Sequence, residues 1–224
     1  MSIVSDAFLG VVITLLSTAL LWVLAWLANQ ARARSRWGFI HANHVTTVLS
    51  ASTEVDTGEY LRPTTGIGQA KALAVLAPSL RRGWKSIDLQ NVVFPEEIQG
   101  RELEGDIILI GGPKTNEVTK RALEKCGGDF GVSQDGSVIT AHNETYSGTV
   151  HETNRDYGLI IRAENPFAAG RKMVLLSGCH TYGTIGAARF FVESKLPRGN
   201  FAMVVETQVQ GKHALPPRMR WCSD

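Results

Sequence analysis

Three segments of the sequence combine glycine with polar side chains, and each follows a short apolar run or the loop after one. They are TTGIG at residues 64–68, GGPKTN at 111–116 and SGCHTYGT at 177–184. Glycine lets the backbone approach a ligand closely, and the N–H groups that open a helix attract anions. In any one segment a tight turn is the simpler explanation. Because strand ends cluster in a parallel sheet, the three segments together predict a site for a phosphate-bearing ligand.

The residues that we expect at this site are glycines and polar side chains. They are Thr65, Gly66, Gly68, Gly111, Gly112, Lys114, Asn116, Gly178, His180, Thr181, Tyr182 and Thr184. A lysine neutralises phosphate, an asparagine pairs with a base or ribose edge, a tyrosine stacks on a base, and a threonine donates to an oxyanion. Two plainer roles stay open, with Lys114 as a solvated loop lysine and Thr184 as the N-cap of a helix.

The familiar motifs of nucleotide and metal enzymes are incomplete in this sequence. Lys71 stands where the dinucleotide fingerprint that starts at Gly66 requires glycine or alanine, and GxxxxGK[ST] does not occur. The six histidines are scattered without metal-ligand spacing, so we expect no metal and no cofactor. Cys179 beside His180 suggests a nucleophile and a base, but neighbouring residues on a strand point apart, and Cys179 suits a small buried position. No catalytic residue is identified.

The charge balance limits the range of partners. The chain has 23 Lys and Arg against 21 Asp and Glu, a formal net charge of +2. Such a weak field excludes a general nucleic-acid-binding surface, so an anionic partner must be recognised locally. The three cysteines are widely spaced without a CxxC pair, which favours a reducing compartment.

Apolar runs of strand length alternate with segments of helical periodicity. We expect helices at residues 69–82, 115–125 and 183–194. We expect strands at residues 44–52, 87–94, 106–110, 157–163, 172–176 and 201–207. Asp135-Gly136 is a hairpin turn signal between two short runs. This order predicts the α/β class, with a Rossmann-like, mostly parallel sheet over residues 44–210, a β-hairpin inserted at one edge, and a tail at 211–224.

The N-terminal region has the composition of a membrane anchor. Residues 8–28 form an uncharged run of 21 residues, which as a helix covers a hydrocarbon core of about 30 Å. A cleavable signal peptide is the competing interpretation, but no Lys or Arg precedes the run. We therefore predict a transmembrane anchor at residues 1–30 and a basic juxtamembrane linker at 31–43. Arg32, Arg34 and Arg36 follow the run, so the positive-inside rule places the C-terminal domain in the cytoplasm and the N-terminus outside.

Small and hydroxyl-bearing residues lie along one face of the predicted anchor. Gly10, Thr14, Ser17 and Thr18 recur at three- and four-residue steps. Such a face lets helices approach closely and predicts a homo-oligomer. The alternative is that the hydroxyl groups bond to carbonyls of their own helix in a monomeric anchor.

One anchor followed by a Rossmann-like domain with glycine-rich loops resembles the membrane effectors of bacterial antiphage immunity, in particular CRISPR-associated Rossmann fold (CARF) sensors fused to a transmembrane helix. The resemblance covers the order of parts and the loops at residues 64–68, 111–116 and 178–184, and the middle hairpin departs from it. It implies a protein of the bacterial inner membrane that binds a nucleotide or a cyclic or linear oligonucleotide messenger, oligomerises and forms a pore or depolarises the bilayer. An anchored enzyme acting on a nucleotide or nucleotide sugar, and an anchored scaffold, remain alternatives.

Overall fold

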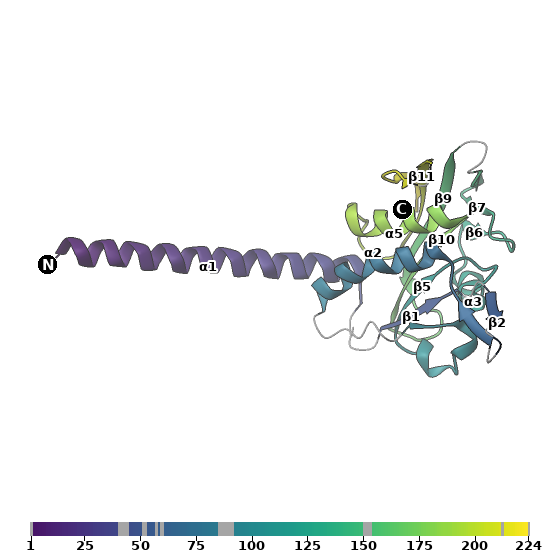
Figure 1. Ribbon diagram of the computed structural model, residues 1–224, viewed down its shortest axis with the longest axis horizontal. Coiled ribbons are helices and arrows are strands. Elements are labelled where there is room, and N and C mark those ends of the chain that lie inside the picture. The colour runs from purple at the N-terminus through teal and green to yellow at the C-terminus, as the bar shows by residue number, and fades with distance from the viewer. Residues whose placement is uncertain are drawn as a thin grey trace.

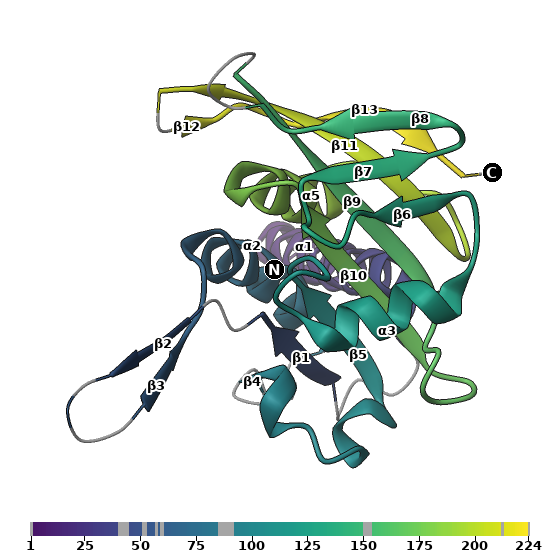
Figure 2. The same cartoon turned by 90° about the vertical axis from the view of Figure 1, so that its right-hand side faces the viewer.

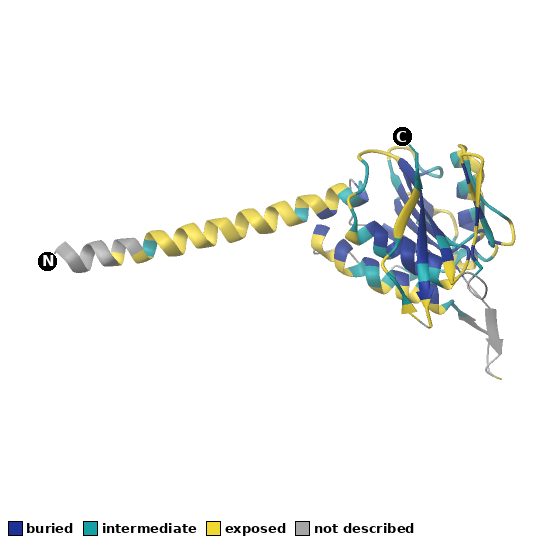
Figure 3. Cartoon of the chain, turned by 90° about the horizontal axis from the view of Figure 1, so that it is seen from above, coloured by how far each residue is buried: buried dark blue, intermediate teal, exposed yellow. Residues whose placement is uncertain are grey.

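A long N-terminal helix projects from an α/β domain (Figure 1). The computed structural model describes residues 2–39, 45–50, 53–56, 58, 61–84, 92–149, 154–211 and 213–223. The helix, α1 (Ser2–Trp37), is continuous through the apolar run and through the basic residues that follow it. Over Val11–Trp37 it is long and apolar enough to cross a bilayer, a test that a signal sequence also passes. Residues 11–29 of this helix are exposed apart from Val12, whereas the domain has a buried centre (Figure 3).

The central sheet is mixed, with a parallel half and an antiparallel half. Its strand order is β12-β11-β9-β10-β5-β1-β4, and β13 also pairs with β11. The parallel half consists of β1 (Val45–Leu49), β4 (Val92–Val93), β5 (Asp106–Ile110) and β10 (Lys172–Gly178). The antiparallel pairings involve β9 (Arg155–Glu164), β11 (Phe201–Gln210), β12 (His213–Ala214) and β13 (Arg218–Cys222). The α/β class is therefore confirmed, with fewer parallel pairings than we expected.

Both faces of the sheet are covered, which explains the unbroken apolar run of β5. On one face α2 (Ile67–Gly83), α5 (Thr181–Glu193) and the end of α1 pack over Ile108 and Ile110. On the other face, α3 (Glu117–Cys126) and a three-stranded sheet pack over Ile107 and Leu109. Figure 2 shows the two layers on either side of the central strands.

The hairpin region differs from the prediction in its position. Asp135-Gly136 does lie in the turn between two antiparallel strands, β6 (Phe130–Val132) and β7 (Val138–Ala141). With β8 (Glu144–Ser147) they form a separate three-stranded sheet, and the expected place at the edge of the main sheet is wrong. The reason is that Ile139 and Tyr146 are buried against the face of the central sheet. A second hairpin, β2 (Thr53–Asp56) with β3 (Leu61–Thr64), lies between the expected strand at residues 44–52 and the expected helix at 69–82, where we predicted neither, and it projects from the domain (Figure 2).

Several element boundaries also differ from the prediction. The tail at residues 211–224 contributes β12 and β13, so it is part of the fold rather than an appendage. Residues 44, 51–52 and 87–91 of two expected strands lie outside the described residues, as do residues 40–43 of the expected linker. Two short 3-10 turns, Pro95–Glu97 and Arg101–Leu103, precede β5.

Up to Trp37, the residues of the expected linker form the last part of α1, and this part packs against the domain. Trp37 is fully buried, its ring packs edge-on against Phe191 at 4.7 Å, and its indole N–H donates to Ser79 Oγ at 3.2 Å. Arg34 Nε donates to the carbonyl oxygen of Gly83, the last residue of α2, at 2.8 Å. This contact ties the end of α2 to α1.

Arginines also hold the ends of α5 and of α1 itself. Arg36 Nη1 donates to the carbonyl oxygens of Phe191 and, at 2.8 Å, of Ser194, at the end of α5. Arg162 of β9 donates to the carbonyl oxygens of Ser35 and Arg36, at 3.0 and 2.6 Å. Cations are favourable at helix C-termini because the last carbonyls lack partners within the helix. The C-terminal ends of α1, α2 and α5 are thus joined into one unit.

Candidate functional site

The three glycine-rich loops begin at one edge of the sheet because their strands end in register. Leu49 of β1 and Leu176 of β10 both align with Ile110 of β5. The ladder extends one residue further, since Gly111 N–H donates to the carbonyl oxygen of Leu176 at 2.9 Å. The loops that follow β1, β5 and β10 therefore start beside one another.

The strand order reverses direction at this edge. The chain passes from β1 through α2 to β4 on one side of β1, and then to β5 on the other side. The helix after β1, α2, and the helix after β5, α3, cover opposite faces of the sheet. At such a reversal the loops diverge and leave a crevice at the carboxyl ends of the strands, where ligands of open α/β sheets bind.

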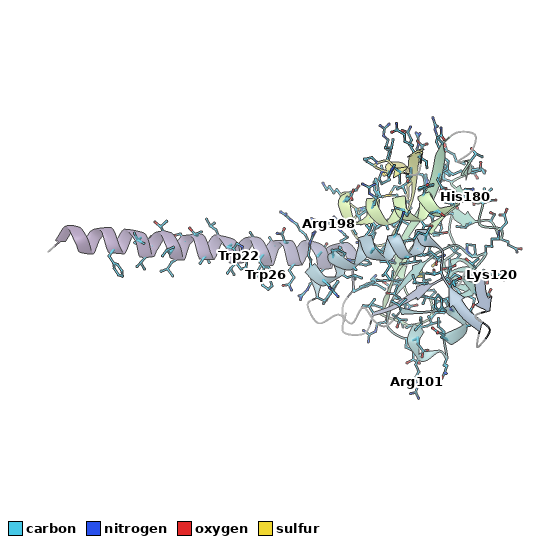
Figure 4. The ribbon with its side chains drawn as sticks, viewed as in Figure 1. Trp22, Trp26, Arg101, Lys120, His180 and Arg198 are labelled. Atoms are coloured by element: carbon cyan, nitrogen blue, oxygen red, sulfur yellow. The ribbon has the colours of Figure 1, made fainter. Side chains whose placement is uncertain are left out.

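A pocket of about 150 Å³ lies between these loops. Nine of the twelve expected residues line it, namely Gly66, Gly68, Gly111, Gly112, Lys114, Gly178, His180, Thr181 and Thr184. Gln69, Thr115, Asp135, Gly136 and Cys179 line it as well, although we did not predict them at the site. His180 lies at the end of the domain away from α1 (Figure 4).

Three expected residues do not line the pocket. Thr65 supports the loop from below, its hydroxyl lying 2.9 Å from the carbonyl oxygen of Ser50 and 2.6 Å from Gln69 Oε1. Asn116 is buried and caps α3, because its Oδ1 accepts from Thr119 N–H at 3.1 Å. Tyr182 lies in the first turn of α5, outside the lining.

Close packing of these loops requires glycine at several positions, and at two of them the glycine lies where neighbouring loops touch. Gly111 has φ of +110°, and a Cβ there would lie 2.8 Å from the Cβ and Oγ of Ser50. A Cβ at Gly68 would lie 3.0 Å from the carbonyl oxygen of Thr181, so the first turns of α2 and α5 touch at this position. For these two residues, packing explains the glycine whether or not a ligand binds.

Hydroxyl groups lie next to two of the glycines that line the pocket, Gly111 and Gly112. Ser50 Oγ hydrogen-bonds to Thr115 Oγ1, which joins the ends of the β1 and β5 loops. Ser177 Oγ is buried and has no hydrogen-bond partner among the described residues. It lies beneath Gly112, since a Cβ there would be 3.1 Å from it. A buried hydroxyl without a partner costs about 1–3 kcal/mol, but Ser177 does not line the pocket.

The two helices that open at the pocket differ in how their N-termini are satisfied. At α5 the buried carboxylate of Asp156 accepts from the N–H groups of His180 at 3.1 Å and Gly183 at 2.6 Å. It also accepts from Tyr157 N–H at 2.9 Å. Burial raises the pKa of this carboxyl, and the three N–H donors oppose that rise. At α2 the N-cap is Gly66, which offers no side-chain cap, so this helix start is the one open to an anion.

Charged groups of opposite sign flank the opening. Lys114 is exposed, and no carboxylate among the described residues lies within 4.0 Å of it. The β6–β7 turn comes close to it, because a Cβ at Gly136 would lie 3.5 Å from Lys114 Cβ. The hydroxyls of Ser133 and Ser137 donate to Asp135 and lower the pKa of its carboxyl to about 2, so Asp135 is ionised at neutral pH. The rim therefore offers one cation and one strong acceptor.

The cysteine and histidine of the third loop are held in structural contacts. Burial raises the pKa of the Cys179 thiol to about 11, so it is protonated at neutral pH and is a poor nucleophile. His180 Nε2 lies 2.8 Å from the carbonyl oxygen of Gly148, a contact that fixes the ring. These contacts favour a binding role for the loop over thiol chemistry.

The chain matches none of the protein-family models and none of the curated protein sequences with which it was compared. Function is therefore argued from the geometry of the site.

Proposed function

We propose that the chain is a membrane-anchored sensor and effector whose cytoplasmic, Rossmann-like domain binds a nucleotide or oligonucleotide messenger. In this proposal the helix at residues 8–28 spans the bacterial inner membrane, and ligand binding changes how the helices of several copies associate, which opens a pore or depolarises the membrane in antiphage defence. One observation carries the proposal. The two helices that start at the pocket, α2 and α5, both end on α1.

The chemistry of the pocket favours a phosphorylated ligand that also carries hydrogen-bond donors. Lys114 and the uncapped start of α2 suit a phosphate, while ionised Asp135 suits ribose hydroxyls or the amino group of a base. An inorganic anion alone would gain nothing from Asp135. The volume of 150 Å³ is below the roughly 300 Å³ of pockets that enclose a drug-sized ligand. We therefore expect the phosphate to enter and the rest of the ligand to lie on the rim.

The architecture supports transmission from this pocket to the membrane. The 17 residues of α2 and the 13 of α5 span about 25 and 20 Å. Their first turns touch at Gly68 and Thr181, and their last residues are held by Arg34 and Arg36 of α1. A ligand that displaces either first turn by a small amount would therefore tilt or rotate α1, provided that it binds one arrangement better than the other.

Action on the membrane requires more than one copy, because a lone helix encloses no channel. In the single chain, the hydroxyls of Ser17 and Thr18 donate to carbonyls one turn earlier, both at 2.8 Å. Such hydroxyls satisfy themselves without a partner and still leave a narrow helix face for close packing. Assembly through the face of Gly10, Thr14, Ser17 and Thr18 is thus compatible with this structure.

A thermal-shift screen of the full chain in detergent tests the proposal. The panel is inorganic phosphate, mononucleotides, dinucleotide cofactors and cyclic oligonucleotides, with oligomeric state measured by light scattering. We expect one nucleotide class to raise Tm and to change the oligomeric state, and phosphate alone to have a smaller effect. A chain that stays monomeric and unshifted throughout the panel would refute the sensor. Turnover of a nucleotide that is lost in His180→Ala would replace the sensor with an anchored enzyme.

A further inference from the structure

A second pocket, of about 710 Å³, lies at the opposite end of the domain, beside the place where α1 enters. It is lined by α1, by Arg162 and by the segment that follows α5. The charged residues of the lining are Arg32, Arg36, Arg162, Glu193, Lys195 and Arg198. Figure 4 shows Arg198 next to the junction between the helix and the domain. The pocket is large enough for a small polar group of the size of a lipid headgroup.

The lining is strongly basic. Five cationic side chains face one carboxylate, that of Glu193, which pairs with Arg189 at 3.6 Å outside the lining. Arg32, Lys195 and Arg198 have no carboxylate within 4.0 Å among the residues that the structure describes. All three are exposed and so are available to a ligand.

The other two cations are held by backbone carbonyls and have a structural role. Arg36 and the buried Arg162 bond to carbonyls at the ends of α5 and α1. Each helix C-terminus is equivalent to about −0.5 charge, so the two that line the pocket, those of α1 and α5, offset about 1 of the positive charges. The pocket keeps a net charge of about +3 after Glu193 and these two helix ends are included. This charge suits an anionic ligand.

The position of the pocket identifies the source of that anion. Arg32 and Arg36 lie four and eight residues beyond Ala28, the last residue of the uncharged run, or about 6 and 12 Å along the helix. The headgroup layer extends about 5–8 Å beyond the hydrocarbon on each side of a bilayer. Lysine and arginine side chains also reach back toward the interface. The pocket therefore opens at the level of the lipid phosphates.

We propose that this basic pocket binds the phosphate headgroup of an anionic phospholipid, with Arg32, Lys195 and Arg198 as its contacts. This inference rests on the membrane anchoring in the proposed function but not on the ligand of the pocket between the three glycine-rich loops. A bound headgroup would bridge α1 and the segment after α5, and would fix the angle between the anchor and the domain. The response of the effector would then depend on the content of anionic lipid in the membrane.

The test uses the full chain in a non-ionic detergent, titrated with short-chain phosphatidylglycerol. Short-chain phosphatidylcholine and inorganic phosphate are the two comparison ligands. At tenfold excess over Kd, we expect phosphatidylglycerol to raise Tm by about 3–6 °C, and phosphatidylcholine to have no effect. Inorganic phosphate should act only at much higher concentration, because it lacks the bilayer-facing glycerol and chains. An equal effect of free phosphate would overturn the assignment to lipid.

Charge-removing variants locate the effect. Lys195→Gln and Arg198→Gln should each weaken the Kd for phosphatidylglycerol about fivefold, since a basic residue near an anionic lipid surface contributes about 1 kcal/mol. Arg101→Gln is the matched control, because Arg101 is also exposed but lies away from α1 (Figure 4). Equal weakening in all three variants, or none in Lys195→Gln and Arg198→Gln, would refute the site.

Carbonate extraction of cell membranes separates this inference from the anchoring on which it rests. A chain that is extracted is not membrane-anchored, and both proposals fail. A chain that resists extraction but shows no preference for phosphatidylglycerol overturns the lipid site alone.

Discussion

Removing the indole of Trp37 tests whether the end of α1 belongs to the core of the domain. Trp37 is fully buried and contacts Phe191 and Phe39, with ring centroids 4.7 and 5.4 Å away. Its N–H donates to Ser79 in α2. Substitution by alanine leaves a cavity between α1, α2 and α5 and leaves the Ser79 hydroxyl without this partner.

The expected cost follows from the size of that cavity. Replacing a buried tryptophan by alanine lowers the free energy of unfolding by about 3–5 kcal/mol. In a domain of this size, each kcal/mol corresponds to about 2–4 °C, so Trp37→Ala should lower Tm by about 6–20 °C. Thermal melting of the full chain in detergent, followed by circular dichroism, measures this change.

The control is Trp22→Ala, which removes the same side chain from an exposed position on the same helix (Figure 4). Surface substitutions of this kind change stability by about 0.5 kcal/mol or less, and we expect a Tm within about 2 °C of wild type. If Trp37→Ala melted within that same interval, the end of α1 would not be part of the core. The connection from the pocket through α2 and α5 would then have no fixed contact with α1.

Two further substitutions test the loops and the start of α5. Gly111→Ala should destabilise by about 1–3 kcal/mol in urea denaturation, from positive φ and a clash with Ser50. Gly100→Ala, at φ +109° in open space, carries the strain alone, so an equal loss in both variants would exclude the clash. Asp156→Asn should cost about 1–3 kcal/mol, because an amide N–H₂ faces Gly183 N–H in place of an acceptor. Because the pKa of Asp156 is raised in the folded chain, folding favours its protonated form. The free energy of unfolding of the wild type therefore falls as pH rises from 3.8, the ordinary pKa of an aspartate, through the higher pKa of the folded chain. The asparagine in the variant does not titrate, so the difference in free energy of unfolding between wild type and variant should shrink between pH 4 and 8. A difference that grew with pH would contradict the raised pKa of Asp156.

The meeting of the three loops could be predicted from the sequence because it follows from topology. Strands that are parallel and in register end at one edge, so the loops after β1, β5 and β10 had to meet once the strands were recognised. The apolar run of residues 106–110 identified the central strand for the same reason, since only a strand covered on both faces lacks alternation.

The role of Asp156 as the buried cap of α5 could not be predicted from the sequence. Asp156 lies on β9, which pairs antiparallel with β10 and so begins at the edge where the parallel strands end. Nothing local in the sequence indicates that pairing. The same holds for Asp135, which reaches the pocket only because the β6–β8 sheet packs over the central sheet.

The basic residues after the apolar run carry two signals that the sequence does not separate. Arg34 and Arg36 match the positive-inside pattern, and in the structure they cap α2 and α5. In the sequence, alternating arginines indicate a solvated linker, because the helix ends that they contact lie 49 or more residues away along the chain. The tail was missed for a related reason, because β13 is short, rich in basic residues and defined by its partner β11.

Titration of the full chain with the nucleotide that raises Tm most tests the central claim directly. Isothermal calorimetry should give a Kd that Lys114→Gln weakens about tenfold or more, since a hydrogen bond to a charged group contributes about 1.5–3 kcal/mol. Lys120→Gln, on the exposed side of α3 (Figure 4), should stay within twofold of wild type. An unchanged Kd in Lys114→Gln, or equal weakening in both variants, would contradict a phosphate site between the three loops.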